Sequence, residues 1–374
     1  MKYLLLFTCL CPSLALASEP VTGLQNEQPE SGRFVMTDQG FMVPYDMPIP
    51  GTDVVFSMEP IPGGEITIGS DKRHYRVEPF WLGRYEVTWA EYNRFMDLYD
   101  AFKQFQIDRT RTVNESNEVD AITAPTPLYE PTYTFEYGDD PQQPAVTVTQ
   151  YSAKQYTKWL AAITGQQFRL PAEAEWEHAA RAGTTTLWHF GDSVMDLGDY
   201  AWFDETTDGE GPQKVGQKKP NAWGLYDMLG NVGELVLDGP DSTSPSGDKV
   251  LDAATDWIHA TTPDQRKVCG GSWESSGDDC TSTSRMLTVH EEWKDVDPNI
   301  PKSPWWFTDD PARGVGFRIL RPLKKVSREE MEEYWKIDNE SLRWDVFDRV
   351  DEGRGVKGLV DPGLPQAIND LAGG

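Results

Sequence analysis

Glycine and proline interrupt this sequence so often that long regular elements have little room to form. The chain holds 32 Gly and 27 Pro, and the runs between them are mostly short and strand-like. Both residues mark turns and break helices and strands. The pattern therefore predicts an α+β domain with much irregular structure and few short helices, and it argues against a regular helical bundle.

The charge balance restricts the partners of the chain. It carries 61 acidic and 34 basic side chains, a formal net charge of -27. Such a surface repels nucleic acid and anionic membranes, so we expect neither nucleic-acid binding nor membrane insertion. The 14 Trp, 14 Tyr and 15 Phe are sufficient to fill a core, which predicts a globular protein.

The first residues are typical of a signal peptide. Lys2 precedes an apolar run over residues 4–16, and Ala15 and Ala17 form a small-residue cleavage site. The alternative is a membrane-spanning helix, but Pro12 interrupts the run, which is shorter than the ~20 apolar residues that cross a bilayer. We expect cleavage after residue 17 and export, to a periplasm or out of the cell.

Composition divides the mature chain into three parts. Residues 18–53 are rich in Pro, Gly and acids without a sustained period, which predicts an extended N-terminal arm. The main domain is expected over residues 54–322, with residues 103–145 as a polar inserted loop. In residues 323–374, Ser327 and Glu330 have capping-box spacing and predict a charged helix, followed by a loose tail.

Within the main domain the sequence predicts three helices. Thr88 and Glu91 have the spacing of a capping box and would open the first. A second is expected over residues 152–163, with Gly165 as its stop. A third is expected after Pro171.

Several segments, taken together and in order, resemble the formylglycine-generating enzyme and sulfatase-modifying factor family. They span roughly residues 54–322, and none is specific alone. The segments are Ile61 to Glu65 (IPGGE), Tyr85 to Thr88 (YEVT), Phe168 to Glu177 (FRLPAEAEWE), Pro220 to Met228 (PNAWGLYDM), Gly230 to Val232 (GNV), Gly270 to Trp273 (GGSW) and Gly316 to Arg318 (GFR). The resemblance implies this family's fold, a variant of the C-type-lectin-like fold.

The resemblance also implies a structural calcium site. Calcium prefers an all-oxygen shell of carboxylates and carbonyls. By position, its ligands would be the side chains of Asp227 and Glu234 and the carbonyl oxygens of Gly230 and Val232. The alternative is a loop with two solvated acids.

The catalytic site that the resemblance implies is incomplete. Aerobic enzymes of the family hold copper between two cysteine thiolates just after the Gly-Gly-Ser segment, and copper(I) favours such soft ligands. Here the second position is Cys280, but the first is Ser275. Cys269 could supply the missing sulfur if the loop folds back, or it could form a disulfide with Cys280.

The resemblance and the incomplete thiolate pair together leave two possible functions. The first is an exported enzyme that oxidises a cysteine of a target polypeptide to formylglycine, with Cys280 as the surviving redox or metal residue and Ser272 in the same cleft. The second is a non-catalytic, calcium-stabilised, lectin-like module that binds a peptide or a glycan.

Overall fold

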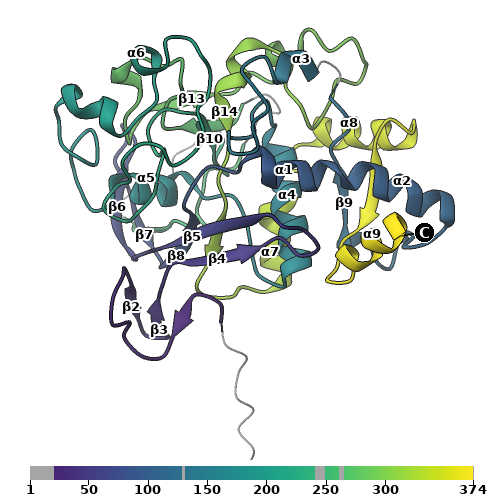
Figure 1. Cartoon of the computed structure of the whole chain (residues 1–374), viewed down its shortest axis with the longest axis horizontal. Helices are drawn as coiled ribbons and strands as arrows, with labels where there is room; N and C mark the ends of the chain where they lie inside the picture. The colour runs from purple at the N-terminus through teal and green to yellow at the C-terminus, as the bar shows by residue number, and fades with distance from the viewer. Residues whose placement is uncertain (1–20, 129–130, 241–248, 261–264, 374) are drawn as a thin grey trace, which may run out of the picture.

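The computed structural model describes residues 21–128, 131–240, 249–260 and 265–373, so the predicted signal peptide lies outside the described residues. Short strands in several small sheets alternate with helices and long loops (Figure 1). This confirms the predicted α+β class with much irregular structure. No helix within these ranges is both long enough and apolar enough to cross a membrane.

An antiparallel sheet in the order β15-β8-β5-β4 forms the base of the domain. Pro60 of β5 pairs with Trp81 of β8, and Arg321 of β15 pairs with Trp81 on the other side. The last strand of the domain thus closes onto one of the first. The strands are β4 (Tyr45–Pro48), β5 (Val55–Ile61), β8 (Phe80–Gly83) and β15 (Leu320–Pro322).

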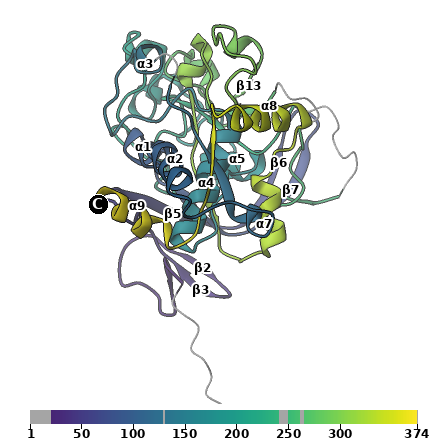
Figure 2. The same cartoon turned by 90° about the vertical axis from the view of Figure 1, so that its right-hand side faces the viewer.

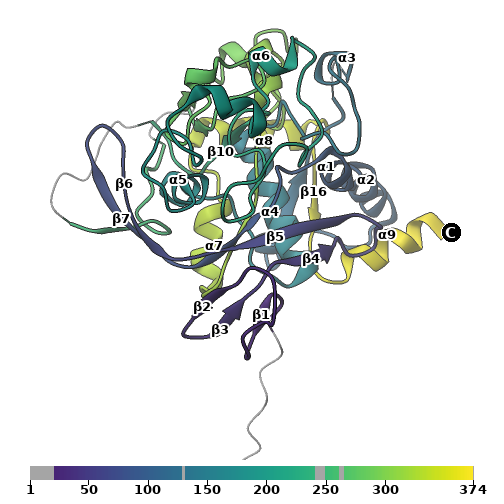
Figure 3. The same ribbon diagram turned by 60° about the vertical axis from the view of Figure 1, so that its left-hand side comes forward.

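A hairpin extends from this base. Strands β6 (Gly64–Ile68) and β7 (Arg73–Val77) pair in antiparallel register, and β11 (Leu251–Asp252) joins β7 in parallel. Figure 3 shows the hairpin as a long twisted ribbon beside α5 (Glu173–Arg181). The side chains of Ile66, Ile68 and Trp176 belong to one buried cluster, which holds the hairpin against the helix.

The third sheet carries the candidate site. Its order is β13-β12-β10-β14, with β10 and β14 parallel and the other pairs antiparallel. The strands are β10 (Gly233–Leu235), β12 (Lys267–Cys269), β13 (Arg285–Leu287) and β14 (Val315–Gly316). They come from distant parts of the sequence, so the sheet brings together loops that are far apart along the chain.

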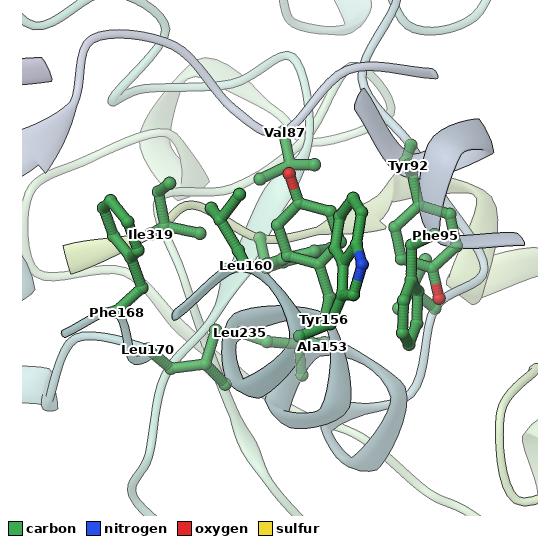
Figure 4. Packing of buried hydrophobic residues seen from close by; sticks show 14 of the residues in the cluster. Val87, Tyr92, Phe95, Ala153, Tyr156, Leu160, Phe168, Leu170, Leu235 and Ile319 are labelled. Carbon is green, nitrogen blue, oxygen red and sulfur yellow. The ribbon is translucent and has the colours of Figure 1, made fainter. Parts of the chain in front are cut away.

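Helix α4 (Gln150–Thr164) is the centre of the main core. The Thr149 side chain accepts a hydrogen bond from the Ser152 amide at its start, and Gly165 ends it at φ 68°. Figure 4 shows Tyr156 and Leu160 of this helix packed among Tyr92 and Phe95 of α1 (Trp89–Met96), Leu235 at the end of β10 and residues of several loops. The predicted second helix and the capping box of the first are confirmed.

The expected insertion over residues 103–145 is not merely a loop. Helix α2 (Leu98–Asp108) enters it, and β9 (Ala121–Ala124) is buried throughout. The prediction was wrong there because the partner of β9 is β16 (Val356–Leu359), more than 200 residues later. The remaining short elements are η1 (Glu118–Asp120), α3 (Pro131–Thr134), η2 (Val194–Asp199), α6 (Asp204–Thr207), η3 (Gly277–Asp279), η4 (Glu292–Lys294) and η5 (Asp310–Gly314).

The end of the chain is ordered rather than loose. Ser327 and Glu330 form the predicted capping box of α7 (Arg328–Trp335). Helix α8 (Glu340–Asp351), β16 and α9 (Leu364–Gly373) follow and close the side of the domain beside α2 and α4 (Figures 1 and 2). The expected tail is therefore incorrect, because residues 356–359 complete a sheet with β9.

The described part of the N-terminal arm contains short strands. Strands β1 (Leu24–Gln25), β2 (Val35–Thr37) and β3 (Gly40–Met42) form a small antiparallel sheet in the order β1-β3-β2. Strand β4, also within the predicted arm, joins the base sheet. The arm thereby leads into the domain through strand pairing.

Candidate functional site

The loop after β12 returns sharply on itself at two glycines. Gly270 and Gly271 have φ values of 98° and 76°, a region that side chains with a Cβ rarely adopt. A Cβ on Gly271 would lie 2.8 Å from the Cys280 sulfur and 2.6 Å from the Asp279 carbonyl oxygen. Glycine is therefore needed here for the start of the loop to approach its end.

This return brings Ser272, Ser275 and Cys280 together. The Ser272 amide donates to the Ser275 hydroxyl at 2.9 Å, and the two hydroxyl oxygens lie 3.4 Å apart. The Cys280 thiol donates to the Ser272 carbonyl oxygen at 3.7 Å. Three residues predicted for the catalytic site thus share one small cluster.

The Cys280 side chain lies in an environment that favours the thiol. Burial, with a smaller contribution from Asp279, raises the pKa of Cys280 to about 12. Its carbonyl oxygen accepts a hydrogen bond from Trp188 Nε1 at 2.7 Å, which anchors the backbone. In this arrangement Cys280 is protonated at neutral pH, whereas metal binding and nucleophilic attack need the thiolate.

Cys269 belongs to a different part of the core. It is the last residue of β12 and packs in the cluster that contains Trp176 and Met228, while Cys280 packs with Trp188 and Phe203. Both cysteines are buried free thiols, so the disulfide considered from the sequence is not formed. Burial also raises the pKa of Cys269.

A cavity of about 310 Å³ opens beside the two serines. Apolar and polar groups alternate around it, and Arg285 forms part of its wall. The guanidinium of Arg285 is held by Glu173 at 2.8 Å and by Glu177 at 2.5 Å, so its position is set by the helix α5. The lining residues are Gly233, Val268, Gly271, Ser272, Ser275, Asp279, Ser284, Arg285 and Met286.

The predicted calcium positions lie in one buried segment that leads into β10. Asp227 accepts from the Gly216 amide through Oδ2 at 2.7 Å, while its buried Oδ1 has no hydrogen-bond partner among the described residues. Burial, with repulsion from Glu234, raises the pKa of Asp227 to about 6. Oδ1 of Asp227 is therefore available to a ligand.

Glu234, in contrast, uses both carboxylate oxygens within the protein. Arg318 contacts them at 2.5 and 2.7 Å, and Trp176 Nε1 donates to one at 2.7 Å. A bidentate pair of this kind is among the strongest side-chain contacts. Through its pair with Arg318, Glu234 links β10 to the GFR segment.

The sequence analysis did not identify a third buried carboxylate, Glu86. It accepts from the Val232 amide at 3.0 Å and from Asn231 Nδ2 at 2.8 Å. Burial and the charges of Asp227 and Glu234 raise its pKa. Its place in the YEVT segment, between Tyr85 and Val87, was the available indication, because an acid that is buried with such neighbours needs a partner.

The donor set does not fit a two-thiolate copper ion. The position next to Cys280 carries the Ser275 hydroxyl, and the second cysteine of the mature chain, Cys269, lies in another cluster. Within the described ranges no group of three or more His, Cys, Asp or Glu side chains is arranged to hold a metal. A calcium ion fits in part, since Asp227 has a free buried oxygen.

Comparisons with known proteins agree with these motifs. A family model described as the sulfatase-modifying factor enzyme 1-like domain matches residues 52–299. The formylglycine-generating enzyme of Bos taurus is 28% identical over 235 residues, which cover 52% of this chain and 60% of that protein. The formylglycine-generating enzyme of Mycobacterium tuberculosis is 31% identical over 153 residues, 36% of this chain and 49% of that protein.

A solved structure supports the fold. Treponema denticola variable protein 1 superposes with a TM-score of 0.51 at 21% identity, covering 75% of this chain and 99% of that one. The matches to the curated enzymes span about half to three fifths of their length. Because the family model covers well over half of the sequence, this chain belongs to the sulfatase-modifying factor family and has the fold of the formylglycine-generating enzymes.

Proposed function

We propose that this chain is an exported member of the family that holds a polypeptide in the cavity beside Ser272 and Ser275, without a two-thiolate copper centre. The observation that carries the proposal is the Ser275 side chain, which contacts Cys280 at the position where an oxidase of the family has a second thiolate. Family membership supports a polypeptide as the partner. The sequence of residues 1–17 supports export to a periplasm or out of the cell.

The chemistry of the ligands argues against copper. Copper(I) selects soft sulfur donors, and a serine hydroxyl is hard and weakly acidic. Cys280 alone would have to bind as a thiolate, although burial raises its pKa to about 12. A single cysteine sulfur with a hydroxyl beside it lacks the second soft donor that copper(I) prefers.

The cavity suits a peptide better than it suits a metal. Val268 and Met286 offer apolar contact, while Ser272 and Ser275 offer hydroxyls that can bond to a peptide backbone. Its volume of about 310 Å³ is at the small end of binding pockets, which is enough for one or two side chains. Arg285, fixed by two glutamates, adds a rigid wall.

The test adds the missing thiol. Wild-type mature protein and the Ser275→Cys variant are titrated with copper(I) and incubated aerobically with a peptide containing Cys-x-Pro-x-Arg, which is then analysed by mass spectrometry. We expect the wild type to bind the peptide without converting it, and Ser275→Cys to gain copper(I) binding. Ser276→Cys is the matched control, because Ser276 is exposed and bonds to Asp279 instead.

A second candidate function is the oxidase itself. The observation in its favour is that Cys280 keeps its place beside Ser272 in the family's catalytic loop. Conversion of the peptide to formylglycine by the wild type, lost in Cys280→Ala, would establish this function and overturn the first proposal. Binding of a glycan instead of the peptide would also contradict the first proposal, that the cavity holds a polypeptide.

We further propose that calcium binds at Asp227 and stabilises a lectin-like frame. Three buried carboxylates, Glu86, Asp227 and Glu234, surround one guanidinium, Arg318, and a divalent cation would offset the excess negative charge. Oδ1 of Asp227 and the carbonyl oxygens of Gly230 and Val232 would hold the ion, with Glu234 as a ligand only if it leaves Arg318.

Calcium added to EDTA-treated protein should raise its melting temperature. At a hundred times the dissociation constant the gain in unfolding free energy is about 2.7 kcal/mol. Asp227→Asn should abolish the gain, since Asn tolerates the φ of 55° at this position but carries no charge. The exposed Asp278→Asn is the control, and an equal calcium effect in both variants would refute the assignment.

A further inference from the structure

The C-terminal elements enclose a groove of about 600 Å³, which shares no lining residue with the cavity beside Ser272 and Ser275. Its floor is α4, one wall is α8, the other is the pair β9–β16, and the end of α7 closes it (Figures 1 and 2). Helices α7 and α8 and strand β16 lie beyond the matched segment of residues 52–299. The groove is therefore formed in part by elements that lie outside the matched family domain.

Most of its inner surface is apolar. Ile122 of β9, Ile337 after α7 and Val346 of α8 face it, and Tyr151 contributes an aromatic ring from α4. The Tyr151 hydroxyl bonds with the Thr123 hydroxyl at 2.6 Å, so this polar end is already satisfied. A volume of several hundred cubic ångströms with apolar walls is typical of a small-molecule site.

The cationic side chains that line the groove differ in whether they pair with a carboxylate. Lys158 pairs with Glu332 at 2.9 Å, Lys357 pairs with Glu118 at 2.7 Å, and Lys336 pairs with Glu333. Arg343, an exposed residue in the first half of α8, lines the groove and has no carboxylate partner among the described residues. In a chain with a net charge of -27, it is the cation of this groove that remains available to an external anion.

The two ends of the α8 wall carry opposite charges. Arg343 and Asp351 both line the groove and stand eight residues apart on one helix, about 12 Å at 1.5 Å per residue. Val346 and Val350 lie between them on the same wall. An anion is attracted at the Arg343 end and repelled at the Asp351 end.

We propose that this groove binds a medium-chain fatty acid, with the carboxylate on Arg343 and the acyl chain along Val346 and Val350. The guanidinium accommodates a carboxylate in a bidentate pair, and the apolar walls take the chain out of water. Asp351 excludes a second carboxylate at the far end, so a monocarboxylate fits and a dicarboxylate of the same length does not. The proposal is independent of the function of the Ser275 cavity.

The test uses the whole mature protein and decanoate in isothermal titration calorimetry, with decanol and decanedioate as parallel probes. We expect decanoate to bind, and decanol and decanedioate to bind more weakly. Arg343→Gln should weaken decanoate binding by about two- to fivefold, the loss of one ion pair at an exposed position. Arg94→Gln, which removes a partly exposed arginine that lies on α1 outside the groove, is the control and should leave binding unchanged.

Further arms separate the groove from other sites. Asp351→Asn should improve the binding of decanedioate, because it removes the repulsion. Equal binding of decanoate and decanol, or an unchanged affinity in Arg343→Gln, would overturn the proposal. The absence of any heat of binding for decanoate in the wild type would also overturn the proposal. Both variants replace exposed side chains of α8, so we expect them to fold and to be available for the assay.

Discussion

Several buried acids in this protein accept hydrogen bonds from specific donors of the protein. Glu91 is buried at the start of α1, where its carboxylate accepts from the Thr88 amide at 3.0 Å and from the Thr88 hydroxyl at 2.7 Å. Burial nevertheless dominates and raises the pKa of Glu91 to about 7. The folded protein therefore favours the protonated form of this side chain near neutral pH.

This shift predicts a pH dependence of stability. The raised pKa of Glu91 contributes stability that is fully present below about pH 4.5 and is lost as pH rises through about 7. The loss amounts to about 3 kcal/mol for a shift of this size. In denaturant titrations, Glu91→Gln should thus become more stable relative to the wild type by about that amount between pH 4.5 and pH 8.

Glu330→Gln is the control for this experiment. Glu330 makes the same capping box with Ser327 at the start of α7, but on the surface. Glu330→Gln therefore removes a capping carboxylate without removing a buried acid. A parallel pH profile for Glu91→Gln and the wild type would show that burial does not determine the titration of Glu91.

Among the elements, the last strand is held by contact with a helix near the start of the domain. Strand β16 lies against α2, and a Cβ on Gly358 would come 2.3 Å from the Phe102 ring. The ring thus occupies the space that a side chain would need. Close approach of backbone and ring explains why glycine stands inside a strand, where it is otherwise unfavourable.

Gly358→Ala should destabilise the protein by about 1–3 kcal/mol, the usual cost of overpacking a filled site. Gly198→Ala is the matched control, because its nearest new contact is an ordinary one of 3.5 Å to Thr206. It should change the free energy of unfolding by less than about 0.5 kcal/mol. Equal effects in the two variants would mean that β16 can separate from α2 without loss.

At the scale of the whole molecule, the net charge of -27 opposes the folded state. Exposed carboxylates repel one another, and several of the 61 acids are also buried near the candidate site. Compact packing brings these charges closer than they are in the unfolded chain. Dissolved salt reduces the repulsion between the exposed groups.

The melting temperature of EDTA-treated protein should therefore rise by a few degrees as NaCl increases from about 0.02 M to about 0.5 M. The gain should level off near the upper value, because the Debye length is then about 4 Å. Scanning calorimetry provides the measurement. A melting temperature that falls with salt, or that rises only above about 1 M, would contradict self-repulsion as the cause.

Local features were predictable from the sequence because their physics is local. The capping boxes at Thr88 and Ser327 and the stop of α4 at Gly165 each depend on residues a few positions apart. The ordered motifs also identified the family, and from this resemblance Ser272, Ser275 and Cys280 were predicted to lie in one loop. No long-range information was needed for any of these.

Contacts between distant residues could be decided only by the tertiary structure. The pairing of β9 with β16, the ion pair of Glu234 with Arg318, and the separation of Cys269 from Cys280 in two clusters all depend on how sheets and helices pack. Burial depends on the same packing, and burial raises the pKa of Cys280 and leaves Oδ1 of Asp227 without a partner. The residue types were visible in the sequence, but their chemistry depends on neighbours that only the folded chain brings together.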